Sequence, residues 1–132
     1  PKEFDRLAGE HKTHFERLET ARKMAKKYSI NIVLKGAYTA VINIEGNVFF
    51  NCTGNPAMAK GGSGDVLTGI ILGLLSSGYQ PFDAARLGVY VHGKAADLAL
   101  ENQSPESMVA SDLIDYLGKA YNFVRRIQDL QG

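Results

Sequence analysis

The stretch that decides the fold is TGNPAMAKGGSGDVLTG, residues 53–69. It follows a β-branched and aromatic segment and leads into an apolar one, so it is predicted to connect a strand to a helix. Glycine occupies three of the four positions 61–64, which lets the backbone bend tightly and leaves no Cβ to block a ligand. Because the first N–H groups of a helix are unpaired and lie at the positive end of its dipole, these glycines predict an anion-binding site.

Asp65 stands at the start of the same helix, where the helix dipole favours a carboxylate. Beside a phosphate held by backbone N–H groups, an ionised carboxylate can accept the proton of an attacking hydroxyl. This is the arrangement that phosphoryl transfer needs. The stretch therefore indicates phosphoryl-transfer chemistry with Asp65 as the base.

Two common phosphate-binding motifs do not fit this spacing. A Walker A loop ends in Gly-Lys-Ser/Thr, but Lys60 precedes the glycines. A dinucleotide fingerprint has a third glycine where Leu67 stands. On the local residues alone, a glycine-rich turn in which Asp65 merely caps a helix is the alternative.

On the N-terminal side, the sequence predicts a helix and three strands. Apolar residues recur at three- and four-residue steps over 4–28, with a break at Gly9 and a possible cap at Thr13. A β-branched run over 30–35 is typical of a strand, and residues 38–51 are typical of a hairpin with a turn near its middle.

On the C-terminal side, the sequence predicts helices. The segment 65–78 is apolar on nearly every side and is predicted to be a central helix. A second helix is predicted from Pro81, a loop over 102–108, and a last helix over 112–130 with Ser111 as its cap.

Composition narrows the class of protein. The 132 residues carry 15 Lys+Arg against 14 Asp+Glu, a net charge of +1, which argues against general affinity for nucleic acid or anionic membranes. The single cysteine excludes an internal disulfide and has no neighbours of a structural zinc site, so no metal site is predicted. No apolar run approaches the roughly 20 residues that cross a bilayer, and no signal-peptide pattern is present, so a cytoplasmic location is expected.

The stretch 54–69 resembles the signature of the ADP- or ATP-dependent NAD(P)H-hydrate dehydratases. The matching runs are Gly-Asn-Pro at 54–56, Met-Ala at 58–59, Gly-Gly-Ser-Gly-Asp at 61–65 and Leu-x-Gly at 67–69. Ala57 and Lys60 depart mildly from the usual Gly and Thr, and neither change removes a catalytic group.

Flanking segments resemble the same family, in the same order. They are the opening Pro-Lys-Glu-Phe at 1–4, Leu-Lys-Gly-Ala-x-Thr at 34–39, Val-His-Gly at 91–93 with Asp97, and Ala-Ser-Asp-Leu-Ile at 110–114. The likeness therefore extends from residue 1 to about residue 118.

The resemblance implies an α/β chain: the C-terminal half of a ribokinase-like three-layer α/β/α fold, with a central sheet and packed helices. The dehydratase domain of that family has roughly twice this length. Residues 1–132 are thus expected to be the C-terminal portion of one dehydratase domain, with the N-terminal half absent. Such a chain is expected to form a homo-oligomer or to associate with the missing half.

The activity implied by the resemblance is repair of hydrated NADH or NADPH. ADP or ATP, with Mg²⁺, phosphorylates the ring hydroxyl, and phosphate then leaves to restore the dinucleotide. Asp65 would be the catalytic base and would contact this substrate together with Glu3 and Phe4. The nucleotide-binding positions would be Lys35, Gly36, Ala37, Tyr38, Thr39, Asn55, Met58, Ala59, Lys60, Gly61, Gly62, Ser63 and Gly64.

Two other functions stay open at the level of the sequence. A ribokinase-like kinase of a vitamin precursor or sugar would share the anion site and Asp65, although the lead-in 55–59 and the element at 3–4 favour the dehydratase. A non-catalytic nucleotide-binding fragment is the second alternative. His92 is predicted to be a buried, hydrogen-bonded histidine of a helix, and the choice between ADP and ATP and the presence of a fused epimerase domain are left open.

Overall fold

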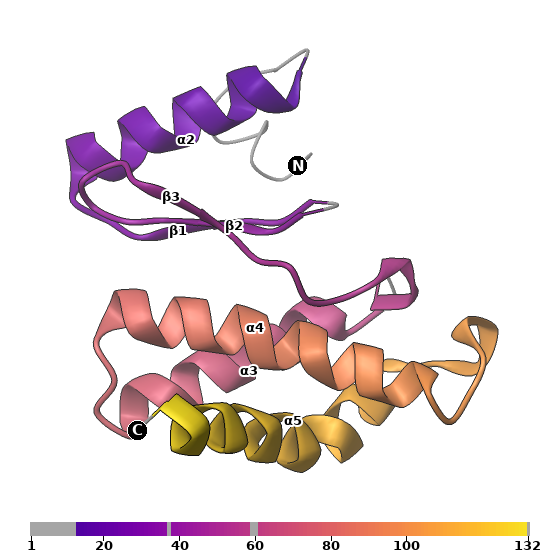
Figure 1. Ribbon diagram of the computed structural model, residues 1–132. Helices are drawn as coiled ribbons and strands as arrows, with labels where there is room; N and C mark the ends of the chain where they lie inside the picture. Colours follow the sequence, from indigo (N-terminus) through magenta and orange to yellow (C-terminus); the bar gives the residue numbers. More distant parts are fainter. Residues whose placement is uncertain (1–12, 37, 59–60, 132) are drawn as a thin grey trace. The chain divides into compact units, whose positions relative to one another are not determined.

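The computed structural model describes residues 13–36, 38–58 and 61–131 (Figure 1). Its contacts divide the chain into two compact units, Pro1–Cys52 and Thr53–Gly132. Helices and strands are labelled as in Figure 1. In chain order they are α2 (His14–Tyr28), β1 (Ile32–Leu34), β2 (Ala40–Ile42), β3 (Val48–Phe50), α3 (Ser63–Ser76), α4 (Pro81–Leu100) and α5 (Ala110–Gln131), with short 3₁₀ turns η1 (Pro56–Met58) and η2 (Pro105–Ser107).

Helix α2 begins and ends where its capping residues stand. The hydroxyl of Thr13 accepts the N–H of Glu16 at 3.1 Å, which confirms the cap predicted at Thr13. Ser29 takes a left-handed conformation at the other end, with φ of 53°, and its N–H bonds to the carbonyl of Ala25. The helix therefore has a defined length on which its apolar face can pack.

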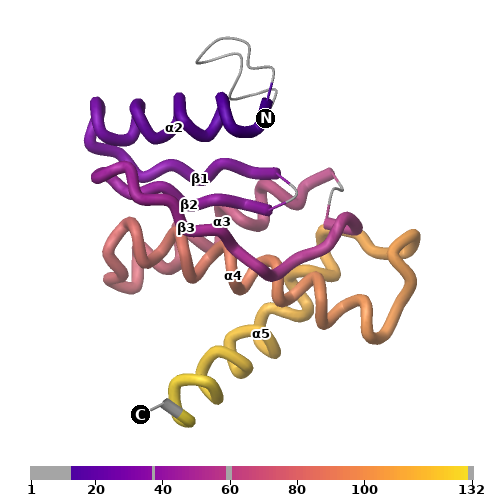
Figure 2. The backbone as a smooth tube through the Cα atoms, turned by 45° about the horizontal axis from the view of Figure 1, so that its top comes forward, coloured from indigo at the N-terminus to yellow at the C-terminus, as the bar shows by residue number. Residues whose placement is uncertain are grey.

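The first unit places α2 on one face of a small sheet. The strands pair antiparallel in the order β1-β2-β3 (Figure 2). Val41 lies opposite both Val33 and Phe49. Ala21 and Ala25 of α2 pack against Ile42 of β2, and all three are fully buried. Small side chains on the helix bring its backbone close to the sheet and so exclude water from this core.

The predicted hairpin over 38–51 is confirmed as β2 and β3. In its turn, the side-chain oxygen of Asn43 accepts the N–H groups of Glu45 and Asn47 at 3.0 and 2.9 Å. Gly46 has a φ of +82°, which a residue with a side chain rarely adopts. The strand predicted over 30–35 is shorter than expected, since only Ile32–Leu34 pairs with β2.

The second unit consists of α3, α4 and α5, with both α3 and α5 packed on α4 (Figure 1). The buried positions of α4 are mostly small or β-branched. At Gly88 an added Cβ would lie 2.7 Å from Cγ1 of Ile71, so glycine is what lets α3 approach α4 there. No helix among the described residues combines the length and the apolar character that a bilayer span requires.

Two predictions about helix ends are wrong. Helix α3 begins at Ser63, before Asp65, and α5 begins at Ala110, so Ser111 lies within its first turn. Asp112 in the first turn reaches back to the residue before the helix, because its Oδ2 accepts the N–H of Val109 at 2.8 Å. This bond, and a second from the Gln103 side chain, lower the pKa of Asp112.

The central position predicted for α3 holds for one face of the helix. Leu67, Ile70 and Leu74 are buried, whereas Leu72 is 57% exposed in this structure. The opposite face is thus uncovered by the described part of the chain.

A close approach fixes the start of the second unit on α4. The hydroxyl of Thr53 donates to the carbonyl of Tyr90 at 2.9 Å. A Cβ placed on Gly93 would lie 2.7 Å from the carbonyl carbon of Thr53 and 2.8 Å from the N of Gly54. These are backbone atoms that cannot rotate away, so only glycine fits at position 93.

Substitution of Gly93 by alanine should therefore destabilise the protein. We expect Gly93→Ala to lower the free energy of unfolding by about 1–3 kcal/mol, the usual cost of overpacking. Gly118→Ala on α5 is the matched control, because nothing lies within 4 Å of its added Cβ. Alanine there should raise stability by about 0.5–1 kcal/mol through helix propensity. Urea unfolding followed by circular dichroism measures both, and equal effects would contradict the close packing at Gly93.

Candidate functional site

The segment 53–58 is held on α4 by Asp97. One carboxylate oxygen of Asp97 accepts the N–H of Gly54 at 3.0 Å, and the other accepts the side-chain amide of Asn55 at 2.8 Å. Gly54 has a φ of +103°, which turns the backbone at this point. Both oxygens of one carboxylate are thus engaged by neighbouring residues of the glycine-rich stretch.

Asn55 also organises the turn η1 that follows. Its side-chain oxygen accepts the N–H of Ala57 at 3.0 Å, and its backbone carbonyl accepts the N–H of Met58 at 3.1 Å. The sulfur of Met58 lies 3.4 Å from the N of Asn55 and would be 2.6 Å from a Cβ on Gly54. The turn therefore folds back on Gly54, and a side chain there would have to displace the Met58 sulfur.

The N-terminus of α3 has the features of an anion site. Gly62 is its N-cap, with φ of 88° and ψ of −10°, and no side chain of the described residues caps this end. Gly61 and Gly62 are exposed. Helix N-termini leave N–H groups without intrahelical partners, and the helix dipole adds positive potential there. Such N–H groups can hold a bound phosphate.

Ser63, the first residue of α3, is hydrogen-bonded to His92 of α4. Its hydroxyl lies 3.2 Å from Nε2 of His92, and both residues are buried. This confirms the prediction that His92 is a buried, hydrogen-bonded helix residue. The contact joins the anion site to α4, the same helix that holds the segment 53–58.

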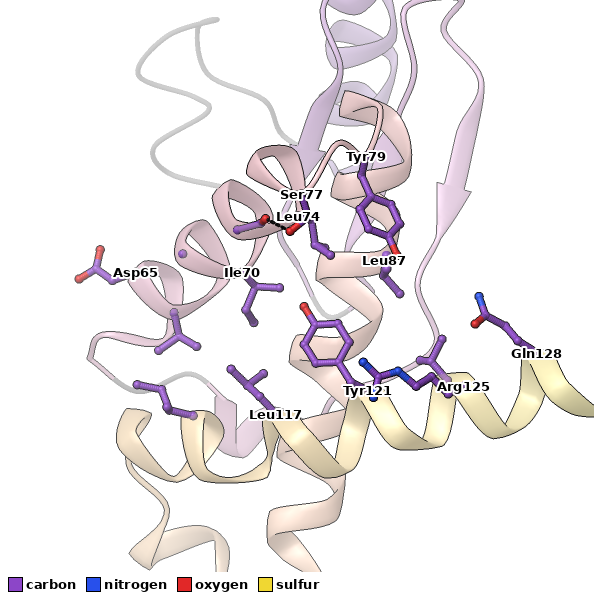
Figure 3. A pocket seen from close by; sticks show the side chains of 15 residues that line it. Asp65, Ile70, Leu74, Ser77, Tyr79, Leu87, Leu117, Tyr121, Arg125 and Gln128 are labelled. Atoms are coloured by element: carbon purple, nitrogen blue, oxygen red, sulfur yellow. Dashed lines mark hydrogen bonds between the residues drawn. The ribbon is translucent and has the colours of Figure 1, made fainter.

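Asp65 follows in the first turn of α3 with an exposed side chain. It stands at one end of a groove between α3 and α5, and Figure 3 shows its carboxylate pointing outward, away from Ile70 and Leu117. The groove has a volume of about 840 Å³, with Tyr79, Tyr121 and Arg125 farther along it. An exposed carboxylate beside free helix N–H groups is accessible to a substrate hydroxyl, as a general base must be.

The groove is apolar along its floor and polar at the end away from Asp65. Burial, and after it the neighbouring Tyr79, raises the pKa of Tyr121, so its phenol stays protonated near neutral pH. Among the residues that the structure describes, no group of three or more His, Cys, Asp or Glu could hold a metal ion.

The remaining predicted site residues fall into two groups. The first group lies in the connection from β1 to β2, in the first unit, and comprises Lys35, Gly36, Tyr38 and Thr39. Tyr38 is 74% exposed, and the carbonyl of Thr39 accepts the N–H of Asn51. Glu3, Phe4, Ala37, Ala59 and Lys60 lie outside the described residues.

Asp97 and Gly93 are the contributors to the site that sequence reasoning did not assign. In the sequence, Gly93 and Asp97 are only parts of a helical motif. A glycine or a carboxylate in a helix can have several structural roles, and the motif does not choose among them. Tyr90, Gly93 and Asp97 are three and four residues apart, so they share one face of α4. That shared face is the signal that could have singled them out, and it is the face that meets residues 53–55.

Comparisons with known proteins identify relatives of this chain. A family model described as NAD(P)H-hydrate dehydratase matches residues 1–119. The bifunctional NAD(P)H-hydrate repair enzyme Nnr of Moorella thermoacetica is 47% identical over 119 residues, 89% of this chain and 22% of that protein. The ADP-dependent (S)-NAD(P)H-hydrate dehydratase of Bacillus subtilis is 38% identical over 123 residues, 92% of this chain and 45% of that protein. The chain thus spans less than half the length of these relatives.

Solved structures agree. The ADP/ATP-dependent NAD(P)H-hydrate dehydratase from Bacillus subtilis, co-crystallized with ATP/Mg²⁺ and soaked with CoA, superposes with a TM-score of 0.85 at 38% identity, covering 92% of this chain and 46% of that one. A ribokinase-like superfamily protein from Enterococcus faecalis gives a TM-score of 0.65 at 31% identity, covering 90% of this chain and 42% of that one. The expected ribokinase-like α/β fold is thereby confirmed. With this fold, and with a family match over 119 of its 132 residues, the chain belongs to the NAD(P)H-hydrate dehydratase family.

Proposed function

We propose that this chain carries the phosphoryl-transfer centre of a nucleotide-dependent NAD(P)H-hydrate dehydratase. The observation that carries the proposal is the start of α3, where a glycine with positive φ caps the helix, no described side chain covers its N–H groups, and Asp65 stands in the first turn. The Bacillus subtilis relative, described as an ADP-dependent (S)-NAD(P)H-hydrate dehydratase, supports hydrated NADH or NADPH as the substrate.

In the proposed reaction, Asp65 accepts the proton of the ring hydroxyl while that oxygen forms a bond to the terminal phosphorus of the nucleotide. The bond from this phosphorus to the bridging oxygen breaks, and the shortened nucleotide leaves. The backbone N–H groups of Gly62, Ser63 and Gly64 hold the transferred phosphoryl group and stabilise its charge. The ring carbon–oxygen bond then breaks, phosphate leaves with the electron pair, and a ring proton passes to solvent as the double bond is restored.

ADP or ATP is the proposed phosphoryl donor. A Bacillus subtilis relative was co-crystallized with ATP/Mg²⁺, which supports both the nucleotide and the ion. Mg²⁺ usually keeps several waters and binds substrate phosphates with one or two carboxylates. The ion would enter with the nucleotide and neutralise its phosphate charge.

The other site assignments remain proposals drawn from the family resemblance. Glu3 and Phe4 would contact the hydrated dinucleotide together with Asp65. The nucleotide would contact Lys35, Gly36, Ala37, Tyr38, Thr39, Asn55, Met58, Ala59, Lys60 and Gly61, besides the three residues of the anion site.

We also propose that residues 1–132 form the C-terminal portion of one dehydratase domain and act together with the remainder of that domain. The chain's 45% coverage of the Bacillus subtilis dehydratase supports this. The uncovered face of α3, with Leu72 57% exposed, supports association with further protein, either the rest of the domain or another copy.

Replacement of Asp65 tests the base. In the full-length protein, Asp65→Asn should lower kcat by about 10²–10⁴-fold, because the amide cannot take the proton. Nucleotide affinity, measured by calorimetry, should stay within about three-fold, since the anion site is unchanged. Turnover is followed by release of inorganic phosphate together with recovery of the dihydronicotinamide absorbance.

Asp115→Asn, an exposed carboxylate of α5, is the control for the loss of one charge. Full activity of Asp65→Asn would end the assignment of the base. Formation of a stable phosphorylated product from a vitamin precursor or sugar, with no phosphate release from hydrated NADH, would favour the kinase alternative.

Two glycines with positive φ test the anion site. Gly62 and Gly78 have φ values of +88° and +97°, at opposite ends of α3. Alanine at either position should cost about 1–2 kcal/mol of stability through left-handed backbone strain. Only Gly62→Ala should also weaken ADP or ATP binding, by about tenfold or more, because backbone strain at this position would displace the N–H groups of residues 62–64 that are proposed to hold the phosphates. Calorimetry and thermal unfolding measure the two effects, and equal nucleotide affinity in both variants would place the phosphates elsewhere.

A further inference from the structure

We infer that Asp97 is a positioning residue, which acts with Asn55 to fix the backbone of the glycine-rich segment in the conformation that binds phosphate. The inference rests on the proposed function for its ligand, and on the geometry of residues 54–57 and α4 for its mechanism. Neither residue needs to touch the reacting atoms, because both act through the segment that they hold.

The hydrogen bonds form a directed chain from α4 to η1. Asp97 accepts from the Gly54 N–H at 3.0 Å and from the Asn55 amide at 2.8 Å, and Asn55 then accepts from the Ala57 N–H at 3.0 Å. Hydrogen bonds to an ionised acceptor are stronger than neutral ones, so the carboxylate is the anchor of the chain. Two of the three bonds engage backbone N–H groups: that of Gly54 bonds to Asp97 on α4, and that of Ala57 bonds to the Asn55 side chain.

This geometry changes the role expected of Asn55. The oxygen of its side chain is used by Ala57, and its amide nitrogen is used by Asp97. Its side chain is therefore part of the support of the segment.

Helix α4 holds the glycine-rich stretch at two points. Asp97 holds it at Gly54 and Asn55, and His92 holds it at Ser63. The two anchor residues on α4 are separated by about 7.5 Å along the helix axis, given the rise of about 1.5 Å per residue. A rigid helix thus sets the spacing between the turn at Gly54 and the phosphate-binding N–H groups of α3.

The donor and acceptor pattern allows a test by exchange of the two side chains. The side chain introduced by Asp97→Asn has one acceptor oxygen instead of two. Its NH₂ group therefore faces a second donor, either the Gly54 N–H or the side-chain amide of Asn55, and one hydrogen bond is lost. Asn55→Asp alone places two carboxylates together. The double variant Asn55→Asp/Asp97→Asn restores every bond. The carboxylate introduced at position 55 accepts from the Ala57 N–H and from the amide introduced at position 97, and the oxygen of that amide accepts from the Gly54 N–H.

The experiment compares the two single variants and the double variant in the full-length protein. We expect each single variant to speed amide hydrogen exchange at Gly54 and Ala57 by about tenfold and to raise the KM and Kd for the nucleotide by about tenfold, with the KM for hydrated NADH unchanged. The double variant should return all of these to within about threefold of the parent. Asp115→Asn should match the parent throughout.

A double variant as impaired as the single ones would overturn the inference, as would single variants with unchanged exchange or unchanged nucleotide affinity. A general loss of stability would instead raise exchange across α4 and α5 and would not separate the two KM values, which also counts against positioning. If the parent protein binds no nucleotide, the proposed function fails, while exchange at Gly54 and Ala57 still decides whether Asp97 and Asn55 fix the segment.

Discussion

The contact between Gly93 and the backbone at Thr53 and Gly54 is the constraint on which the candidate site depends. A Cβ at position 93 would lie 2.8 Å from the N of Gly54, so the helix and the chain touch without a side chain between them. This closeness brings the Gly54 N–H within reach of Asp97 and the Thr53 hydroxyl within reach of Tyr90. A larger residue at 93 would separate the hydrogen-bonding groups as well as the backbones.

The same helix supports the other half of the site. His92, next to Gly93, lies under Ser63 at the start of α3. The small buried positions of α4, such as Gly88 against Ile71, let α3 pack close enough for that hydrogen bond to form. The chemistry assigned to the glycine-rich stretch therefore relies on α4, which contributes no group to the proposed reaction itself.

Local signals in the sequence were sufficient for most of the structure that is made by near neighbours. The Thr13 cap, the hairpin over 38–51 and the positions of the long helices were predictable because each depends on residues a few positions apart. The glycine-rich connection between β3 and α3 was predictable for the same reason, and its role as an anion site stays a proposal. The start of α5 was not, because Ser111 and Asp112 are both good caps and the choice depends on where Val109 and Gln103 lie in the fold.

The part of the site that sequence reasoning could not supply is made by distant residues. A carboxylate at position 97 of an amphipathic helix is compatible with solvent exposure, an ion pair or a hydrogen bond to a loop, and only the fold selects among them. The side-chain contacts of Asn55 could not be predicted for a similar reason, since its partners at 57 and 97 come from η1 and α4. The expected roles of residues 35–39 stay proposals.

The separation of Asp97 from its partners links the site to the order in which the chain acquires structure. Its hydrogen bonds span 43 residues to Gly54 and 42 residues to Asn55, and α3 and most of α4 lie between them. Closing so long a loop has an entropic cost that the neighbouring helix pairs do not face, and it is offset only when those helices have already formed and packed. We therefore expect the conformation held by Asp97 to form late in folding, and a chain in which α3 and α4 have not docked to have the glycine-rich sequence without this geometry.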